Sequence, residues 1–545
     1  MGANPELKKP LEVLRLYDGH DYTLHSAFLS RMRAGPDRPF IIHAGKIYSW
    51  RQFAENVDKV ARLLAAQGIR KGDRVAVMAR NSDKHVLLLM AVARVGGIFV
   101  PINPEFGTAE AGYVLEHSGP AAIACDSDTL GPAQAACRSR GLTPWFMTFG
   151  DSAGDILSLD VLTEQITDAV LPGNVSPDDT CLIVYTSGTT GFPKGVMHSQ
   201  RTFLTVGEAF VQRVYLQPKD RILIVLPLFH MNALFYSVSG TLAAGCSMVI
   251  APRFSASTFW QLAAETGATE VNIIEAIGTI LAYRPRSEFR PEHKLRKVCG
   301  IRQGSAPTFQ NEFGIPHLLT GYGMTEIPGI LCSPFEGLQK PGSMGVLGRH
   351  PDPDRPWAEC RVVDDEGHEV GVDVQGELVV KTPTIMQGYY RDPEQTAAAF
   401  RDGWFLTEDV VRRDADGYFY FVSREKDIIR RRGENISGAE LDRVISEHPQ
   451  VQETAAIPVP ADLGDDEILV AVVPKAGVKL TAEEITRWCS ERLAPVKVPR
   501  YVLFVGELPH TPTHKVAKNV LRADPTLKAR AIDMGTAAPA KSRLA

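Results

Sequence analysis

The 545-residue sequence has few cysteines and no long uninterrupted apolar segment. None of its 8 cysteines is spaced as C-x-x-C or in another metal-binding pattern, so we interpret them as thiols of a reducing compartment. The first residues, MGANPELKKPLEV, lack the apolar core of a secretory signal. The most apolar stretch, residues 85–104, is interrupted by Arg94, Gly96, Gly97 and Pro101, which favours a buried helix and strand over a membrane span. We expect a cytoplasmic protein.

The sequence also has no large excess of positive or negative charge. The sequence has 59 Lys and Arg against 64 Asp and Glu, a formal net charge of -5, which gives no indication of nucleic-acid binding or of a polybasic membrane surface. The length exceeds what one ordinary hydrophobic core accommodates, so at least two domains are expected. The sequence leaves the oligomeric state open, with a homodimer as one option.

The first half of the chain alternates helix and strand signals. A helix is predicted to begin after Ser49, with Gln52 completing a capping box, and to end at Gly68. Short apolar strands are expected at residues 75–79, 98–101, 121–125, 182–185, 222–226 and 248–251. This alternation predicts an α/β fold with doubly wound, parallel sheets that helices cover on both faces.

The pattern changes twice in the second half. From about residue 345, dense glycine and aspartate turns predict a β-rich subdomain. Beyond SREKDIIRRRG, two amphipathic helices and an apolar strand predict a small α+β domain. We predict a large N-terminal domain over residues 1–423, a hinge at 424–427, a small mobile C-terminal domain at 428–522 and a disordered tail at 523–545.

The segment YTSGTTGFPKGV, residues 185–196, follows an apolar run at residues 181–184. Backbone N–H groups of a glycine-rich turn can converge on an anion, and the hydroxyls and the lysine of this segment add donors. The preceding strand would hold the loop at the carboxyl edge of a sheet, where α/β proteins bind ligands. We interpret the loop as a polyphosphate site, with a solvated linker as the alternative. It is not a Walker A loop, because Phe192 and Pro193 separate Gly191 from Lys194.

This loop resembles the signature of the adenylate-forming superfamily, which includes acyl-CoA synthetases. Four further segments follow in the family's order, namely LPLFHMN, QGSAP with GYGMTE, GWFLTEDVV, and LPHTPTHKVAK. The resemblance extends over roughly residues 25–522. It implies ATP, Mg²⁺ and coenzyme A as cofactors or co-substrates, and a small-molecule carboxylic acid as substrate.

The resemblance implies nucleotide-binding roles residue by residue. It places the phosphates of ATP at Thr186, Ser187, Gly188, Thr189, Thr190, Gly191 and Lys194, and adenine between Ser305-Ala306-Pro307 and Tyr322-Gly323-Met324. Thr325 would touch a phosphate, and Glu326 with Thr186 would hold Mg²⁺. Asp409 and Arg424 would hold the ribose and the hinge side of the nucleotide. Catalytic roles fall on His230, Thr325, Glu326 and Lys515.

Two residues depart from the family's pattern. Glu408 and His514 stand where the family usually has glycine. Glu408 could crowd the ribose edge or point outward, and we expect it to point outward. His514 narrows the allowed backbone beside Lys515 and adds bulk there.

The resemblance also implies how coenzyme A reaches the acyl group. Rotation of the C-terminal domain about a hinge at Lys426 would bring Gly433 forward to line the pantetheine tunnel. Arg430, Arg431 and Arg432 form a basic run beside that expected channel. The alternative is a solvated face, but our hypothesis is that at least one of the three arginines contacts the phosphates of coenzyme A.

The expected acyl pocket comprises His230, Met231, Asn232, Glu275, Ala276 and Gly278. The surrounding sequence is similar in texture to the carnitine/crotonobetaine-CoA ligase branch of the family. Glu275 could favour a cationic acyl group if it faces the pocket, or be an ordinary paired carboxylate if it does not. Betaine-like, medium-chain, cyclic and aryl acids all remain open.

The resemblance implies an ATP-dependent acyl-CoA ligase. Such an enzyme activates a carboxylic acid as an acyl-adenylate, releasing pyrophosphate, and transfers the acyl group to coenzyme A, releasing AMP. Lys515 and Mg²⁺ would offset the charge that develops on the reacting phosphate. The alternatives are an adenylating enzyme that loads a carrier protein and a non-catalytic nucleotide-binding relative.

Overall fold

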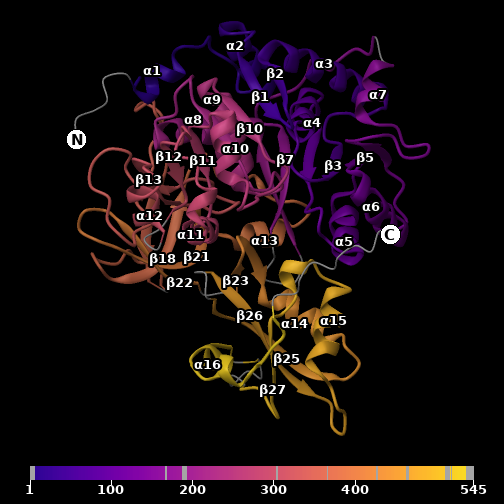
Figure 1. Cartoon of the computed structure of the whole chain (residues 1–545), viewed down its shortest axis with the longest axis vertical. Coiled ribbons are helices and arrows are strands. Elements are labelled where there is room, and N and C mark those ends of the chain that lie inside the picture. The colour runs from indigo at the N-terminus through magenta and orange to yellow at the C-terminus, as the bar shows by residue number, and fades with distance from the viewer. Residues whose placement is uncertain are drawn as a thin grey trace.

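A computed structural model describes residues 7–165, 168–186, 193–301, 305–364, 366–424, 428–461, 465–509, 516 and 518–535. The chain forms a large N-terminal lobe and a smaller C-terminal lobe, which lies below the large lobe in Figure 1. The predicted fold class, an α/β protein with a large N-terminal and a small C-terminal domain, is confirmed. The predicted hinge falls mostly on residues 425–427, which lie outside the described part of the chain.

Two seven-stranded sheets organise the large lobe. The first has the spatial order β13 (His317–Leu319), β12 (Lys297–Cys299), β11 (Glu270–Asn272), β9 (Arg221–Ile224), β10 (Ser247–Ile250), β1 (Pro39–His43) and β2 (Lys46–Ser49). The second has the order β19 (Gly388–Tyr389), β8 (Lys194–Ser199), β7 (Thr180–Thr186), β4 (Ile98–Pro101), β3 (Arg74–Met78), β5 (Ala122–Cys125) and β6 (Trp145–Thr148). Most pairs are parallel, as predicted, but β2, β8 and β19 pair antiparallel with their neighbours.

Helices cover these sheets. They are α1 (Pro10–Leu14), α2 (Leu24–Ala34), α3 (Trp50–Ala66), α4 (Asp83–Arg94), α5 (Thr108–Ser118), α6 (Ser127–Ser139), α7 (Leu159–Glu164), α8 (Gln200–Val214), α9 (Ser239–Ala244), α10 (Phe259–Thr266), α11 (Glu275–Tyr283) and α12 (Ala306–Asn311). A π-helical segment (Asn232–Val238) precedes α9, and a 3-10 turn (Arg286–Glu288) follows α11. The predicted capping box of Ser49 and Gln52 opens α3.

Burial shows that both faces of the second sheet are covered. The largest core packs one face against α3 and α4, through Phe99 and Leu182 with Phe53 and Leu88 among others. A separate core packs the other face against α5 and α6. Strands buried on both sides need apolar side chains at nearly every position, which explains their continuous apolar runs.

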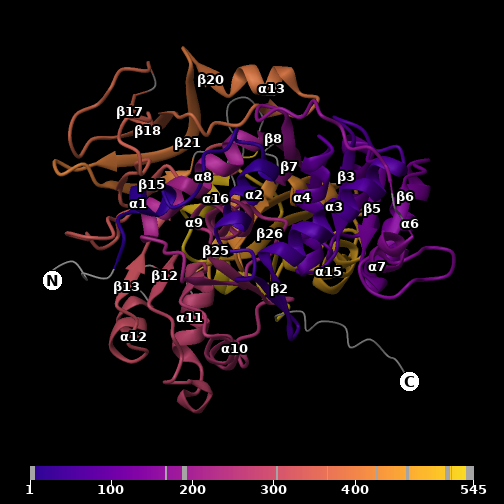
Figure 2. The same cartoon turned by 90° about the horizontal axis from the view of Figure 1, so that it is seen from above.

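A β-rich subdomain completes the large lobe, as predicted. Its strands are β14 (Gly321–Tyr322), β15 (Leu331–Cys332), β16 (Val346–Leu347), β17 (Glu359–Val363), β18 (Gln375–Lys381), β20 (Phe400–Arg401), β21 (Trp404–Arg413) and β22 (Phe419–Arg424), and its helix is α13 (Pro393–Ala398). Figures 1 and 2 place β18 and β21 on the opposite flank of the large lobe from β3 and β5.

The small lobe is built on a four-stranded sheet. Its elements are β23 (Ile428–Arg431), β24 (Glu434–Ser437), α14 (Gly438–Ser446), β25 (Val451–Pro460), β26 (Asp466–Pro474), α15 (Ala482–Ser490), a 3-10 turn (Pro495–Lys497), β27 (Tyr501–Phe504), α16 (Lys518–Arg522), α17 (Leu527–Arg530) and β28 (Ile532–Asp533). Alternate residues of β26 enter two different cores, one of them with α14 and α15 and the other with α16 and α17.

The tail was predicted to be disordered from residue 523, and that prediction was wrong for residues 527–533. Leu527 is 3% exposed in the second core of the small lobe, and β28 pairs with β27. Arg500 joins Asp533 through two hydrogen bonds of 2.9 and 3.0 Å. The Ala- and Lys-rich composition of the tail gave no indication of its buried leucine or of its edge strand. Over the described ranges, no helix has both the length and the apolar character needed to cross a bilayer.

Leu527→Ala tests the packing of this terminal segment. We expect the free energy of unfolding of the small lobe to fall by about 2–4 kcal/mol, because the substitution empties a buried site. Native-state hydrogen exchange of the β27 amides measures this quantity. Val520→Ala removes a side chain that is 53% exposed and serves as the control. Equal exchange in both variants would contradict the packing described here.

Candidate active site

A cavity of about 840 Å³ lies between the two lobes. The large lobe lines it at the carboxyl ends of parallel strands of both sheets, with Pro101, Thr186, Ile273, Cys299 and Thr320 among the lining residues. This is the edge at which open α/β sheets bind ligands. The small lobe contributes Arg430, Gly433, Glu434, Asp465, Asp466 and Lys497.

Seven of the predicted nucleotide-binding residues line this cavity, whereas Ser305, Ala306 and Pro307 are not among its lining residues. Thr186, Lys194, Tyr322, Gly323, Met324, Thr325 and Glu326 all line it. The Tyr322 hydroxyl donates to Asp409 Oδ2 at 2.6 Å. Asp409 is fully buried behind that ring and is not itself a lining residue. Arg424, at the end of β22, pairs with Asp409 through the backbone register of β21 and β22. The structure thus brings together segments more than 80 residues apart.

The glycine-rich loop connects two antiparallel strands. Residues 187–192 lie outside the described residues, but β7 ends at Thr186 and β8 begins at Lys194, so the segment joins a hairpin. The Lys194 ammonium donates to Gln395 Oε1 at 2.5 Å and lies 4.9 Å from the ring centroid of Tyr389. The Tyr389 hydroxyl donates to Glu326 Oε1 at 2.9 Å. Tyr389 therefore contacts both the Lys194 ammonium, at the end of the loop, and the Glu326 carboxylate.

Glu275 lies on the cavity wall and is also hydrogen-bonded. Its Oε1 accepts from the backbone N–H of Ser305 at 3.1 Å and from the Ser305 hydroxyl at 3.0 Å. The carboxylate therefore ties the start of α11 to the start of α12, where Ala306 and Pro307 follow. Of the predicted acyl-pocket residues, His230, Met231 and Asn232 line the cavity as well.

Two predicted acyl-pocket residues do not line the cavity. Ala276 and Gly278 lie in α11 behind the wall. A Cβ at Gly278 would come within 2.8 Å of both Ile301 and Ser305, so this glycine serves close packing of α11. The pattern around residues 272–280 indicated the right segment but not which of its side chains face inward.

Glu408 is one of four consecutive residues of β21 that line the cavity, and the direction of its side chain stays a prediction. Its φ is +58°, in the left-handed region that glycine adopts most readily. Its backbone N–H donates to Glu377 Oε1 at 2.9 Å, where the register of β18 and β21 shifts. A glycine at this position would be unstrained, so a glutamate here carries a conformational cost.

The three consecutive arginines have three different environments. Arg430 lines the cavity, and its backbone N–H donates to Asp466 Oδ2 at 2.9 Å. Arg431 is buried within the small lobe, where it bonds the carbonyls of Val496 and Val498 and pairs with Glu467 at 2.7 Å. Arg432 is exposed and lies outside the cavity lining. Alternation along β23 separates Arg430 from Arg431, and Arg432 lies beyond the strand with a φ of +51°, so Arg430 is the arginine of this run that reaches the cavity.

Gly433 and Glu434 bring the small lobe against the predicted acyl region. Gly433 has φ +82°, and a Cβ there would overlap Ile274 Cδ1, so a larger residue would strain the backbone and displace that side chain. Glu434 Oε1 lies 3.0 Å from His230 Nε2. Burial disfavours the charged imidazole, but the charge and hydrogen bond of Glu434 more than offset that and raise the pKa of His230. His230 therefore joins the two lobes.

The predicted family is confirmed by comparison with known proteins. A family model described as "AMP-binding enzyme" matches residues 28–390. The chain belongs to the AMP-binding enzyme family. A second model, "AMP-binding enzyme C-terminal domain", matches residues 440–515 and so covers most of the small lobe of this AMP-binding enzyme.

Several relatives of this AMP-binding enzyme are CoA ligases. Oxalate–CoA ligase from Arabidopsis thaliana is 32% identical over 500 residues, covering 89% of this chain and 95% of the relative. Sulfoacetate–CoA ligase from Cupriavidus necator is 32% identical over 506 residues, covering 91% and 96%. Crotonobetaine/carnitine–CoA ligase from Salmonella agona is 29% identical, covering 87% and 93%. The solved o-succinylbenzoate-CoA synthetase from Bacillus subtilis matches with a TM-score of 0.80 at 25% identity, covering 93% and 99%.

A buried ion cluster joins the lobes of the AMP-binding enzyme, and sequence reasoning missed it. The Lys497 ammonium donates to Glu110 of α5 at 2.7 Å and to both oxygens of Glu440 of α14 at 2.9 and 3.0 Å. Burial disfavours the charged amine, but the two carboxylates raise its pKa above the ordinary value. Glu110 is 387 residues away in sequence, so no local pattern could have indicated the contact. Lys426, Lys515 and His514 lie outside the described residues.

Lys497→Met tests whether this cluster holds the lobes together. The substitution leaves two buried carboxylates without their cation, which costs about 3–5 kcal/mol. We expect faster hydrogen exchange in α5 and α14 and a larger radius of gyration in solution. Lys528→Met is the control, because Lys528 is a partly exposed lysine of the small lobe that donates to the Pro460 carbonyl. Unchanged exchange in α5 and α14 would show that other contacts set the lobe arrangement.

Proposed function

We propose that this chain is an ATP-dependent, AMP-forming acyl-CoA ligase. A carboxylic acid attacks the α-phosphate of ATP, forming an acyl-adenylate and releasing pyrophosphate. The thiol of coenzyme A then attacks the acyl carbonyl and releases AMP. The observation that carries the proposal is a cavity lined both by seven predicted nucleotide residues of the large lobe and by Gly433 of the small lobe.

The ATP end of the cavity fits a magnesium nucleotide. Glu326 is 7% exposed and offers a carboxylate at the wall, and Thr186 offers a hydroxyl beside the loop. Mg²⁺ bound to ATP takes one or two carboxylates and completes its shell with phosphate oxygens and water. Glu326 and Thr186 would hold the ion, which would neutralise charge on the phosphates. Lys194 would contribute a second positive charge from β8.

The two chemical steps require different groups beside one carbonyl. We propose that Lys515 approaches the α-phosphate for adenylation and that rotation at Lys426 then replaces it with the Gly433 segment. The contact of Gly433 with Ile274 and the bond between Glu434 and His230 support assigning the observed lobe arrangement to the second step. His230 would sit beside the reacting carboxylate in this arrangement.

Coenzyme A is the acceptor that the cavity and the relatives favour. Arg430 stands on the small-lobe wall of the cavity, where a guanidinium could pair with phosphate. The relatives reported above are named as CoA ligases. Carrier-protein loading is the alternative, and release of AMP that depends on free coenzyme A separates the two.

The ligase proposal predicts AMP release only when ATP, coenzyme A and a suitable carboxylic acid are all present. A panel of acids scored by AMP formation tests this. Lys515→Ala should reduce acid-dependent ATP–pyrophosphate exchange by about 10²–10³-fold, because one charge at the transition state is lost. A protein that binds ATP but gives no exchange with any acid would instead be a non-catalytic relative.

Arg430→Ala tests the coenzyme A contact. We expect KM for coenzyme A to rise about tenfold, as for the loss of one charge-assisted hydrogen bond, while ATP–pyrophosphate exchange stays unchanged. Arg432→Ala is the matched control, because that side chain lies outside the cavity lining. If exchange falls as much as the use of coenzyme A, the assigned contact is wrong.

A further inference from the structure

One buried cation on the cavity wall has no carboxylate partner among the residues that the structure describes. Arg213, in the last turn of α8, is 8% exposed and lines the cavity. Its Nε and Nη1 atoms are buried without a hydrogen-bond partner, and no described carboxylate forms an ion pair with it. A buried charge without a counter-ion is strongly destabilising. Its presence on a ligand cavity therefore requires an explanation.

The immediate surroundings of Arg213 do not neutralise it. Its Cζ atom lies 5.1 Å from the ring centroid of Tyr236. An aromatic face attracts a cation but carries no net charge. Gly321 leaves space for the guanidinium, since a Cβ at that position would overlap Nη2. The Tyr236 hydroxyl and the Cys299 thiol also interact with the guanidinium, but burial raises the pKa of both groups, so neither supplies a negative charge.

The acidic groups nearest in the fold do not supply the missing charge. Glu270 of β11 is fully buried, and burial raises the pKa of Glu270 to about 8, so its carboxyl is mostly protonated at neutral pH. Asp220 already pairs with Lys297 at 2.8 Å and with Arg296. Neither carboxylate therefore forms an ion pair with Arg213.

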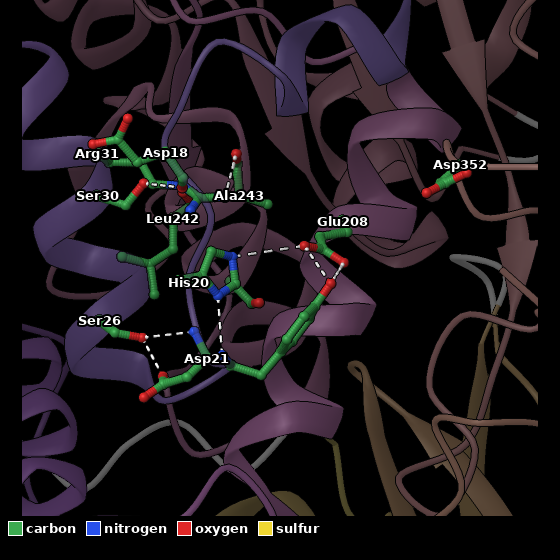
Figure 3. A network of polar contacts seen from close by, with 12 residues as sticks. Asp18, His20, Asp21, Ser26, Ser30, Arg31, Glu208, Leu242, Ala243 and Asp352 are labelled. Atoms are coloured by element: carbon green, nitrogen blue, oxygen red, sulfur yellow. Dashed lines mark hydrogen bonds and ion pairs between the residues drawn. The ribbon is translucent and has the colours of Figure 1, made fainter. Parts of the chain in front are cut away.

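Another buried ion on the same helix shows the contrast. Glu208 is 6% exposed, and Figure 3 shows it beside His20. It accepts from the Tyr22 hydroxyl at 3.0 and 3.1 Å and lies 3.0 Å from His350 Nε2. Helix α8 thus carries one buried ion that the protein satisfies by itself and one that it leaves facing a cavity.

We infer that Arg213 binds a second acidic group of the substrate, so that the ligase activates short acids carrying a further carboxylate or sulfonate. This inference rests on the proposed function. The wall runs from His230, through the π-helical segment that begins at Asn232, to Tyr236 beside Arg213. One acidic group would react near His230 while the other pairs with Arg213. Arginine suits this role because its planar guanidinium matches carboxylate and sulfonate oxygens.

The same observations disfavour a cationic acyl group. The Glu275 carboxylate, which could have attracted a betaine, is held by Ser305. Arg213 would repel a quaternary ammonium in the same cavity. Two of the relatives are named for oxalate and sulfoacetate, acids with two acidic groups, whereas the relative named for crotonobetaine and carnitine has a slightly lower identity.

Matched pairs of acids test the inference by CoA-dependent AMP formation. Oxalate, malonate, succinate and sulfoacetate are compared with acetate, propionate and butyrate, and carnitine provides the cationic arm. The wild-type kcat/KM should be at least about tenfold higher for the best diacid than for its monoacid counterpart. Arg213→Met should reduce that ratio by about 10–100-fold, and Arg213→Lys should retain part of it. A wild-type preference for monoacids or carnitine, or an unchanged ratio in Arg213→Met, overturns the inference.

Stability and binding measurements distinguish a failure of this inference from a failure of the ligase proposal on which it rests. Arg213→Met should not lower Tm, because it replaces an unpaired buried charge with an apolar side chain. A marked fall in Tm would instead indicate a structural arginine and count against the inference. If no acid supports AMP formation, the ligase proposal fails. In that case, calorimetric titration of malonate and of propionate into wild type and Arg213→Met tests the anion site by itself. The inference requires that wild type binds malonate more tightly than propionate and that Arg213→Met loses this selectivity.

Discussion

The ion cluster of Lys497, Glu110 and Glu440 is the contact on which the observed cavity depends. The cavity has walls from both lobes, so it exists in this form only while the lobes stay docked. Three buried charges are tolerable only when they satisfy one another. Separation of the lobes would expose the cluster to water and also withdraw Gly433 from Ile274. Lobe docking, the narrow approach at Gly433 and the His230–Glu434 contact are therefore parts of one arrangement.

Buried charge also connects the fold to the choice of substrate. Glu208 and Arg213 both lie on helix α8, and each is more than nine-tenths buried. Glu208 is enclosed by protein donors, which fixes α8 against the N-terminal segment. Arg213 ends the same helix at the cavity. Helix α8 holds a cation in place without a paired carboxylate. Such a cation is a pre-organised anion site, because folding has already positioned the charge before the anion binds.

Particular elements show how far sequence reasoning reached. The capping box at Ser49 and the apolar runs of the strands are local signals, and the structure has the corresponding elements in place. The ordered motifs predicted the family and the nucleotide end of the cavity. The errors involve orientation and distant contacts. Leu527 packs into a core that the tail composition did not indicate, and Arg431 is buried while Arg430 reaches the cavity.

The sequence by itself determined the fold class, the family and the segments that build the nucleotide site, because caps, periodicity and motif order are encoded over a few neighbouring residues. Only the tertiary structure decided which side chains of those segments face the cavity, which buried charges are paired and how the lobes meet. Glu110 and Lys497 are far apart in sequence, and Arg213 shows no local sign of its role. Pairing of such residues depends on how whole helices and strands pack. The role of a buried charge depends on the groups that surround it.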